Sequence, residues 1–227
     1  MSNENHLTIY YEARNVCIRM MNDRKYVVPL YLNITKAQFD VLLRNNDMDL
    51  KGITYFNKLL QINVPVYVAF ISPDEQFSRA ENKTNIFNKI AQYLQYNDVE
   101  LMENDVKQGR CHIMIVYNAK NQASQNKFEQ TYNDYTNIQI FDVNKLAINV
   151  LNHTYQSKFR LLETDERNVI VRRLGMNMSQ FPTICFDDPV NKYYNGHIGD
   201  MYEIVREGTI VVFKVVSSRM MNLKNKK

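Results

Sequence analysis

The chain has 227 residues, of which 45% are hydrophobic and 23% charged, and its net charge is +4. These values lie close to globular averages and exclude a disordered tail, a collagen-like repeat and a small disulfide-framed protein, while the length fits one large domain or a large and a small one. A net charge of +4 is small for a protein that binds nucleic acid alone, because such binding depends on neutralising many phosphates.

Helix and strand patterns alternate over residues 1–148. Apolar residues recur at helical spacing from Asn5 to Met21, and Thr35 can cap a second helix. In chain order we expect helices at 5–21 and 36–45, strands at 53–56 and 64–71, a break at 72–74, a helix at 84–96, a strand at 112–117 and a helix at 125–132. This alternation predicts an α/β domain in which a mixed sheet is flanked by helices.

The remaining residues, 149–227, have a different pattern. We expect a strand at 158–162, a helix at 165–174 capped within 164–166 and stopped by Gly175, an extended stretch at 182–186, a helix at 188–195 with Pro189 in its first turn, and strands at 201–206 and 209–216. The last two strands surround Glu207-Gly208 and predict a hairpin. The basic, polar residues 217–227 are expected to fray. This part of the chain predicts a small α+β domain.

The cysteines and histidines do not indicate a metal site. Cys17, Cys111 and Cys185 lie far apart and form no C-x-x-C pair, so we expect reduced and mostly buried thiols. The four histidines share no metal-ligand spacing; they are His6, His112, His153 and His197. We expect no metal and no cofactor.

No targeting or membrane segment is expected. No apolar run approaches the roughly 18 residues of a membrane span, and the first residues combine neither a basic leader nor a hydrophobic stretch. The sequence therefore predicts a protein that stays inside a cell.

Several stretches of the C-terminal third follow one another in a recognisable order. They are 180–184 (QFPTI), 187–194 (DDPVNKYY), Gly199-Asp200, and a strand that ends Ile204-Val205-Arg206, preceded by Ile148-Asn149, His153 and a helix at 165–174. In residue type and spacing they resemble the assembly-domain signature of the fifth subunit shared by the eukaryotic nuclear RNA polymerases, a family that includes an archaeal counterpart. The first helix and residues 22–28 resemble the opening of the same family, so the resemblance covers nearly the whole chain.

The resemblance implies an α+β/α/β protein of two domains. Residues 1–148 would form an N-terminal α/β jaw domain, and residues 149–227 a small C-terminal α+β assembly domain with a basic tail. It implies a non-catalytic subunit of a multisubunit DNA-directed RNA polymerase, which docks on the largest subunit, meets other subunits and places its jaw beside downstream double-stranded DNA. Nucleotidyl transfer with Mg²⁺ would occur in the large subunits.

The chain also departs from the family pattern. Basic or turn residues of the family are replaced at Ser157-Lys158-Phe159, Thr183, Asn195 and His197-Ile198, and the segment near Glu207-Gly208 is shortened. Asn tolerates a left-handed backbone, so the turn at Asn195 can survive, whereas the basic contacts are lost. Together with 28 Asn residues, these departures predict a divergent homologue from a large DNA virus, located in the virion and the host cytoplasm. A cellular protein of this kind would be nuclear.

Two functions from other classes remain as alternatives. Asp74, Glu81 and Lys83 have the residue types of a Mg²⁺-dependent nuclease, in which two carboxylates hold the metal and the lysine assists hydrolysis. However, Glu81 and Lys83 precede a helix in a polar turn instead of lying on a strand, which favours solvated side chains. A free nucleic-acid-binding regulator is disfavoured by the small net charge.

For DNA contact, the resemblance implies the polar segment after the strand at 112–117. The candidates are Lys120, Asn121, Gln122, Ala123 and Ser124. Polar side chains and backbone N–H groups at a helix N-terminus can hold a phosphate without strong charge. A solvated loop with a helix cap is the alternative. Arg19, Arg24 and Lys25 could line the same side, and a solvated helix face explains them equally well.

For partner binding, the candidates lie in the C-terminal domain. They are Pro182, Asp188, Pro189, Tyr193, Tyr194 and Arg206, with the strand at 209–216. Tyrosines and exposed strand edges favour contact because they offer large area and unpaired backbone groups. The alternative is that Asp188 caps the helix begun by Pro189 and that both tyrosines belong to the core. A cap and an interface are compatible.

Overall fold

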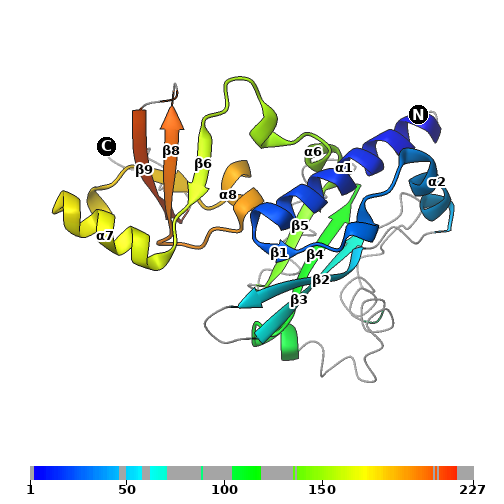
Figure 1. Ribbon diagram of the computed structural model, residues 1–227, viewed down its shortest axis with the longest axis horizontal. Coiled ribbons are helices and arrows are strands. Elements are labelled where there is room, and N and C mark those ends of the chain that lie inside the picture. Colours follow the sequence, from blue (N-terminus) through cyan, green and yellow to red (C-terminus); the bar gives the residue numbers. More distant parts are fainter. Residues whose placement is uncertain are drawn as a thin grey trace, which may run out of the picture. The chain divides into compact units, whose positions relative to one another are not determined.

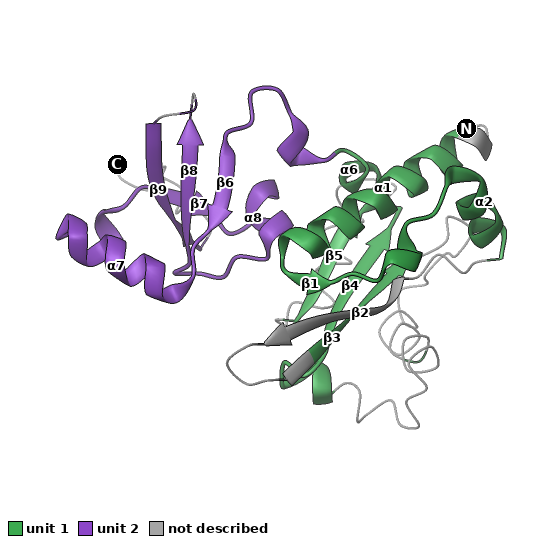
Figure 2. Ribbon diagram, viewed as in Figure 1, with its two compact units in different colours: residues 1–148 green, residues 149–227 purple. Residues whose placement is uncertain are grey.

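The structure is a computed structural model that describes residues 3–45, 50–57, 62–70, 88, 104–118, 135, 137–206, 208 and 210–218 (Figure 1). The chain divides into two compact units, residues 1–148 (unit 1) and 149–227 (unit 2), coloured separately in Figure 2. None of the described helices is both long and apolar enough to cross a membrane.

Unit 1 is built on a mixed five-stranded sheet. Its elements are α1 (Asn3–Asp23), β1 (Tyr26–Val27), η1 (Leu30–Leu32), α2 (Lys36–Arg44), β2 (Leu50–Asn57), β3 (Ile62–Phe70), β4 (His112–Tyr117), β5 (Ile138–Asp142) and α6 (Val143–Leu146). The strands lie in the order β1-β2-β3-β4-β5. The first two pairings are antiparallel and the last two parallel. The predicted mixed sheet flanked by helices is therefore present.

The central strands of this sheet are buried. In β4 every residue from Ile113 to Tyr117 is buried, and in β3 the same holds from Val66 to Phe70. Such continuous apolar runs are typical of parallel strands that are covered on both faces. Helix α1 runs across the sheet in Figure 1, and the Cys17 Sγ of α1 lies 3.8 Å from the Met114 Sδ of β4.

Helix α1 supplies much of the core of unit 1. Its buried apolar residues are Tyr10, Ala13, Val16, Cys17, Ile18, Met20 and Met21. They follow the helical spacing expected from the sequence, and each fully buried methionine contributes on the order of 1.5–3 kcal/mol. Burial raises the pKa of the Cys17 thiol to about 12, which keeps it protonated and unreactive at neutral pH.

Helix α2 begins as the sequence predicts. The Thr35 Oγ1 accepts a hydrogen bond from the Gln38 backbone N–H at 3.3 Å, and the Gln38 Oε1 accepts one from the Thr35 N–H at 2.8 Å. This reciprocal capping box satisfies two donors at the helix start. The buried Phe39 turns inward and its ring lies 5.7 Å from that of Tyr11 on α1.

Four elements of unit 1 are not expected from the sequence: the short β1 and η1 between the two predicted helices, and β5 and α6. β5 and α6 occupy a region between the predicted helix at 125–132 and residue 149 for which the sequence predicts no element. The alternation of Ile138 and Ile140 is the available signal, but it extends over too few residues to distinguish a strand from a loop. The predicted break at 72–74, the helices at 84–96 and 125–132 and the tail beyond 218 lie outside the described residues, apart from Asn88.

Unit 2 contains a four-stranded sheet. Its elements are η2 (Val150–Asn152), β6 (Lys158–Leu161), α7 (Thr164–Leu174), η3 (Met178–Gln180), β7 (Thr183–Cys185), α8 (Pro189–Tyr194), β8 (Met201–Arg206) and β9 (Ile210–Ser217). The order is β6-β8-β9-β7, and only the pairing of β7 with β9 is parallel. The predicted hairpin is confirmed: β8 and β9 pair from Met201↔Val215 to Arg206↔Ile210.

Both faces of the second sheet are covered. On one face Leu162, Phe181, Met201 and Val215 form a core against which α7 packs. The opposite face has a second core of Ile184, Tyr202, Ile204 and Val216, joined by Tyr194 of α8.

The three cysteines are free thiols; Cys17 and Cys111 are buried and Cys185 is partly buried.

The cap of α7 lies one residue earlier than predicted. The N-cap residue is Glu163, whose backbone N–H donates to the Glu166 Oε2 at 3.0 Å, and Thr164 is already helical. A glutamate three residues after the cap can return to the cap N–H, which moves the start upstream of Thr164. The helix ends as predicted at Gly175, which has a left-handed φ of 61°.

Candidate functional site

The partner-binding candidates of unit 2 lie on and around α8. The Asp188 Oδ1 accepts a hydrogen bond from the Val190 N–H at 2.8 Å, and Pro189 occupies the first turn. The helix ends at Asn195, which has a left-handed φ of 58°. The predicted cap and the survival of the turn at Asn195 are both confirmed. Pro182 and Pro189 are exposed and Asp188 is half-buried.

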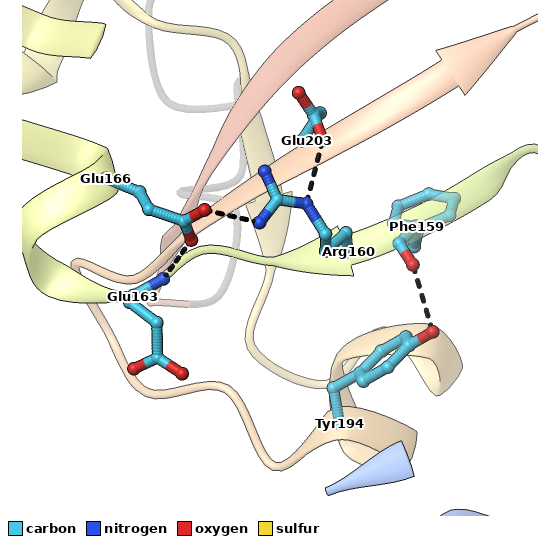
Figure 3. Close-up of polar contacts among 6 residues, drawn as sticks. All are labelled: Phe159, Arg160, Glu163, Glu166, Tyr194 and Glu203. Carbon is cyan, nitrogen blue, oxygen red and sulfur yellow. Dashed lines mark hydrogen bonds and ion pairs between the residues drawn. The ribbon is translucent and has the colours of Figure 1, made fainter. Parts of the chain in front are cut away.

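The two tyrosines of α8 are used inside unit 2. Tyr193 is buried, which agrees with the alternative that assigned it to the core and leaves little of its side chain for a partner. Tyr194 is partly buried, and its hydroxyl donates to the Phe159 carbonyl at 3.0 Å (Figure 3). Its ring centroid also lies 5.9 Å from that of Tyr202. Tyr194 therefore ties α8 to β6 and β8.

A buried amide that sequence reasoning missed organises the end of α8. The Asn191 Nδ2 donates to the Phe186 carbonyl at 2.9 Å and to the Gly196 carbonyl at 3.0 Å, while its Oδ1 accepts from the Tyr202 hydroxyl at 2.9 Å. These bonds join the segment before α8, the turn after it and β8. The only sequence signal was a polar residue between the apolar Val190 and Tyr193, and such spacing does not distinguish a buried amide from a surface one.

A charged cluster on the surface joins β6, β8 and α7. The Arg160 guanidinium donates to Glu166 at 2.6 Å and to Glu203 at 2.9 Å (Figure 3). These hydrogen bonds, first with Glu166 and then with Glu203, raise the pKa of Arg160. All three side chains are at least partly exposed, so the cluster orients the elements more than it stabilises them.

The turn between α8 and β8 is held by a second polar cluster. The His197 backbone N–H donates to the Asp200 Oδ2 at 2.7 Å, and the Arg167 guanidinium of α7 donates to the Gly199 carbonyl at 3.0 Å. Gly199 has a φ of 92°, which favours glycine. The His197-Ile198 pair, a departure noted in the sequence, thus lies in a turn that is held by hydrogen bonds.

Arg206 lies at the opposite end of the sheet from these turns. It is the last residue of β8, is exposed, and pairs in register with Ile210 at the start of β9. The structure thus does not bring Arg206 together with the α8 candidates. It places Arg206 beside a second exposed region, the start of β9.

The DNA-contact candidates Lys120 to Ser124 lie outside the described residues. The preceding residue that is described, Asn118, follows β4, and its Oδ1 accepts a hydrogen bond from the Asn144 Nδ2 at 3.1 Å. Of the nearby basic residues, Arg19 is exposed, whereas the Arg24 Nη1 donates to the Gln139 Oε1 of β5 at 2.7 Å. The Arg24 side chain therefore links the end of α1 to β5.

The nuclease candidates Asp74, Glu81 and Lys83 also lie outside the described residues. Over the described parts of the chain, no three His, Cys, Asp or Glu side chains come close enough together to hold a metal ion.

Comparison with known proteins gives a consistent assignment. The family model "RNA polymerase Rpb5, C-terminal domain" matches residues 148–216. The chain is 26% identical over 195 residues to the "DNA-directed RNA polymerases I, II, and III subunit rpabc1" of Dictyostelium discoideum, an alignment that covers 86% of this chain and 88% of that relative. It is 33% identical over 63 residues to the "DNA-directed RNA polymerase subunit Rpo5" of Sulfolobus acidocaldarius, which covers 28% of this chain and 75% of that relative.

A plant relative extends this comparison. The "DNA-directed RNA polymerases IV and V subunit 5B" of Arabidopsis thaliana is 19% identical over 197 residues, covering 86% of this chain and 82% of the relative. These relatives, eukaryotic and archaeal, are all subunits of DNA-directed RNA polymerases. The chain belongs to the Rpb5 family, the family of the fifth shared subunit and its archaeal counterpart. Members of this family are non-catalytic, so the chain is a polymerase subunit and not itself an enzyme.

Proposed function

We propose that this subunit docks on the largest subunit of its RNA polymerase through unit 2 and places unit 1, as a jaw, beside downstream double-stranded DNA. The observation that carries the proposal is the family match over residues 148–216, which falls almost entirely within unit 2. Unit 2 keeps the family pattern, whereas unit 1 has a looser resemblance to it. This difference fits a subunit in which unit 2 binds the rest of the polymerase and unit 1 contacts DNA.

The exposed segment from β7 to α8 supports docking through unit 2. Pro182 and Pro189 are exposed on either side of Phe186, which is also exposed. The hydrogen bonds of Asp188, Asn191 and Tyr194 hold this segment in one conformation without a partner. A preorganised surface loses little conformational entropy when it binds. In this proposal Asp188, Tyr193 and Tyr194 shape the surface, and the prolines and Phe186 contact the partner.

The distribution of charge supports only weak contact with free DNA. Unit 2 contains 12 basic and 8 acidic residues, which leaves 28 − 12 = 16 basic and 24 − 8 = 16 acidic residues in unit 1. A jaw with zero net charge gains little from counterion release. We expect residues 120–124 to contact phosphate usefully only when the polymerase holds the jaw and the DNA together, which raises their effective concentration.

The docking proposal is tested by co-purification with the largest subunit from the native source, at a salt concentration that strips nucleic acid. We expect the full chain to stay bound, because the contact is made between proteins. A truncated chain comprising residues 1–148 should be lost from the complex. Isolation of the chain as a free monomer under the same conditions would contradict the proposal.

The DNA proposal is tested in the assembled enzyme. Replacing Lys120, Asn121 and Gln122 by alanine together should shorten the protected downstream DNA in a footprint, while the variant subunit still co-purifies with the polymerase. The matched control replaces the exposed Asn33, Lys36 and Asn45 by alanine, which also removes one lysine and two side-chain amides elsewhere on unit 1. An unchanged footprint for the Lys120 variant would exclude this segment as the contact.

The source and location of the protein form a separate part of the proposal. We propose, from the Asn-rich composition and the departures from the family pattern, that a large DNA virus encodes it. The protein would then act in the host cytoplasm and be packaged in the virion. Detection by antibody in purified virions tests this, and a signal only in the nuclei of uninfected cells would contradict it.

A further inference from the structure

One strand of unit 2 has an open edge over half of its length. β9 pairs with β8 from Ile210 to Val215, and the Val216 N–H continues this side with a bond to the Asp200 carbonyl. On its other side β9 meets only the three residues of β7, which pair with Val215–Ser217. The first half of β9 therefore has a neighbouring strand on one side only, within the part of the chain that the structure describes.

The hydrogen bonds at the end of β9 show which backbone groups face this edge. The Val216 N–H donates to the Asp200 carbonyl on the β8 side at 2.8 Å, whereas the Val215 N–H donates to the Pro182 carbonyl on the β7 side at 2.9 Å. Successive residues of a strand point their N–H and C=O groups to opposite sides. Counting back by twos from Val215, the N–H and C=O groups of Phe213 and Val211 point away from β8, toward the open side.

Pro182 ends the ladder between β7 and β9. In a parallel ladder, the next bond after that of Ile184 would run from the N–H of residue 182 to the Phe213 carbonyl. Proline has no N–H, so the ladder ends there. A residue that the sequence indicated as a partner-binding candidate thus leaves the Phe213 carbonyl without a donor from β7. The residues before it, Met178–Gln180, form η3 and not a strand, so β7 does not continue alongside Val211.

The side chains beside this edge suit an apolar strand with one acidic group. Ile210 and Val211 are 52% and 48% exposed, although both are large and β-branched. Exposed edges of this composition pair readily with another chain, and native proteins usually cover them. Arg206 lies across from Ile210, is exposed, and has no acidic partner among the described residues.

We propose that the β9 edge at Val211 and Phe213 receives an extended segment of the polymerase's largest subunit as an added strand, with apolar side chains against Ile210 and Val211 and a carboxylate on Arg206. This inference rests on the proposed docking function and names the mode of contact. Main-chain hydrogen bonds supply the affinity in such a contact, and the side chains beside the edge supply the specificity.

A second copy of this chain fits the edge less well. If two β9 edges paired antiparallel around residue 212, Ile210 of one copy would lie opposite Lys214 of the other, with Arg206 directly behind Ile210. Arg206 and the Lys214 of the other copy would then lie on one face of the joined sheet about 10 Å apart, two strand spacings, with only Ile210 between them and no acidic side chain to neutralise them. The charges of the edge favour an acidic partner instead.

Amide hydrogen exchange on the free full-length chain and on the intact polymerase tests the proposal. In the free chain we expect the amides of Val211 and Phe213 to exchange rapidly and that of Val212, which faces β8, to be protected. In the polymerase, the first two should slow by at least about tenfold. Protection of these amides in the free chain that disappears on dilution would identify a second copy as the occupant and overturn the proposal.

A pair of variants at Val211 separates backbone pairing from side-chain contact. Val211→Pro removes the outward N–H while keeping the bonds to β8, and should weaken binding to the largest subunit by about tenfold or more. Val211→Thr keeps the N–H and the β-branched shape, and should bind almost as the native chain does. Thermal unfolding of each free variant checks that the hairpin remains folded.

The outcomes distinguish this inference from the function on which it rests. If the chain co-purifies with the polymerase but Val211→Pro binds normally and both amides exchange as in the free chain, docking stands and the added strand is wrong. If the native chain does not bind the largest subunit at all, both proposals fail. Arg206→Glu should weaken binding more than Arg206→Ala, and equal binding of the two would exclude the carboxylate.

Discussion

Arg14 in unit 1 and Asn191 in unit 2 are both polar residues buried on helices, at 2% and 1% exposed. The three polar contacts of Asn191 are complete, as they join two carbonyl groups and one hydroxyl. Arg14 makes one buried hydrogen bond, from its Nη1 to the Leu32 carbonyl at 2.8 Å, and its Nε has no partner among the described residues.

This difference shows that burial of a polar group can serve two purposes. Asn191 specifies a particular turn, because no other side chain of its size would satisfy the same three groups. Arg14 covers the Phe39 ring with its guanidinium, 6.0 Å from the centroid, and the desolvation that results lowers its pKa. Arg14 therefore contributes mainly through the packing of its side chain, while the burial of its charge lowers the stability of the fold.

The strongest disruption of the Asn191 network is expected from Gly196→Ala. A Cβ at this position would clash with the Asn191 Oδ1 and lie 2.6 Å from the Tyr202 hydroxyl oxygen. Displacing these buried groups should lower the free energy of unfolding by about 3 kcal/mol, measured by urea denaturation.

The matched control is Gly175→Ala at the end of α7. Its Cβ would meet nothing within 4 Å, although its φ of 61° is left-handed. The control should cost only about 1–2 kcal/mol, the penalty of the backbone conformation. Equal losses for the two variants would show that the clash at Gly196 is relieved by movement of the chain.

The next effect in size is expected from Asn191→Leu. This change removes the hydrogen bonds that the Asn191 amide makes with the Phe186 and Gly196 carbonyls and with the Tyr202 hydroxyl in the interior, and should lower the free energy of unfolding by about 2–3 kcal/mol. Arg160→Ala, which removes the exposed ion pairs of Figure 3, is the control and should cost less than about 1 kcal/mol.

Arg14→Met should change stability little, in contrast to Asn191→Leu. Methionine keeps most of the volume and removes a buried charge that lacks an acidic partner among the described residues, so the free energy of unfolding should change by less than about 1 kcal/mol. Chemical denaturation of both variants side by side makes the comparison. A loss of several kcal/mol for Arg14→Met would mean that the Leu32 carbonyl depends on it as strongly as the turn depends on Asn191.

The smallest effect concerns pH and the turn at His197 and Asp200. Partial burial opposes ionisation of Asp200, but the hydrogen bonds from His197 and the charges of His197 and Arg167 outweigh it and lower its pKa below the ordinary 3.8. The Asp200 carboxylate in turn raises the pKa of His197 above 6.5. The stability from Asp200 is lost as the pH falls through its lowered pKa, and that from His197 is lost as the pH rises through its raised pKa.

The contribution of this turn should therefore be full between about pH 4 and 6.5 and smaller at pH 8. Because both side chains are partly exposed, the difference should be only a few tenths of a kcal/mol. Unfolding curves of the native chain and of His197→Asn at pH 5.5 and pH 8 measure it. A native chain that is more stable relative to His197→Asn at pH 8 than at pH 5.5 would contradict the assignment.

Local signals in the sequence predicted most of the described elements. Thr35, Gly175, Asp188 and Asn195 marked helix ends because caps and left-handed positions depend on residues adjacent to them in the chain. β5 was missed because a five-residue strand becomes recognisable only when it pairs with β4.

The candidate site was predicted less completely. The sequence indicated Pro182 and the strand at 209–216 as candidates separately, but the open edge of β9 exists only because parallel pairing places them side by side. Tyr193 and Tyr194 looked equally available, and packing buried one and bound the hydroxyl of the other to β6.

The family was indicated by the resemblance of the sequence to a known family. The division into an α/β part and an α+β part, the helix caps and the hairpin were predictable from the amino-acid sequence alone, because these depend on composition and on neighbours within a few residues. Tertiary structure alone decided which polar groups are satisfied and, among the described residues, which part of β9 has a neighbouring strand on one side only. Both depend on distances between residues far apart in the chain, such as Asn191 and Tyr202, or Pro182 and Phe213.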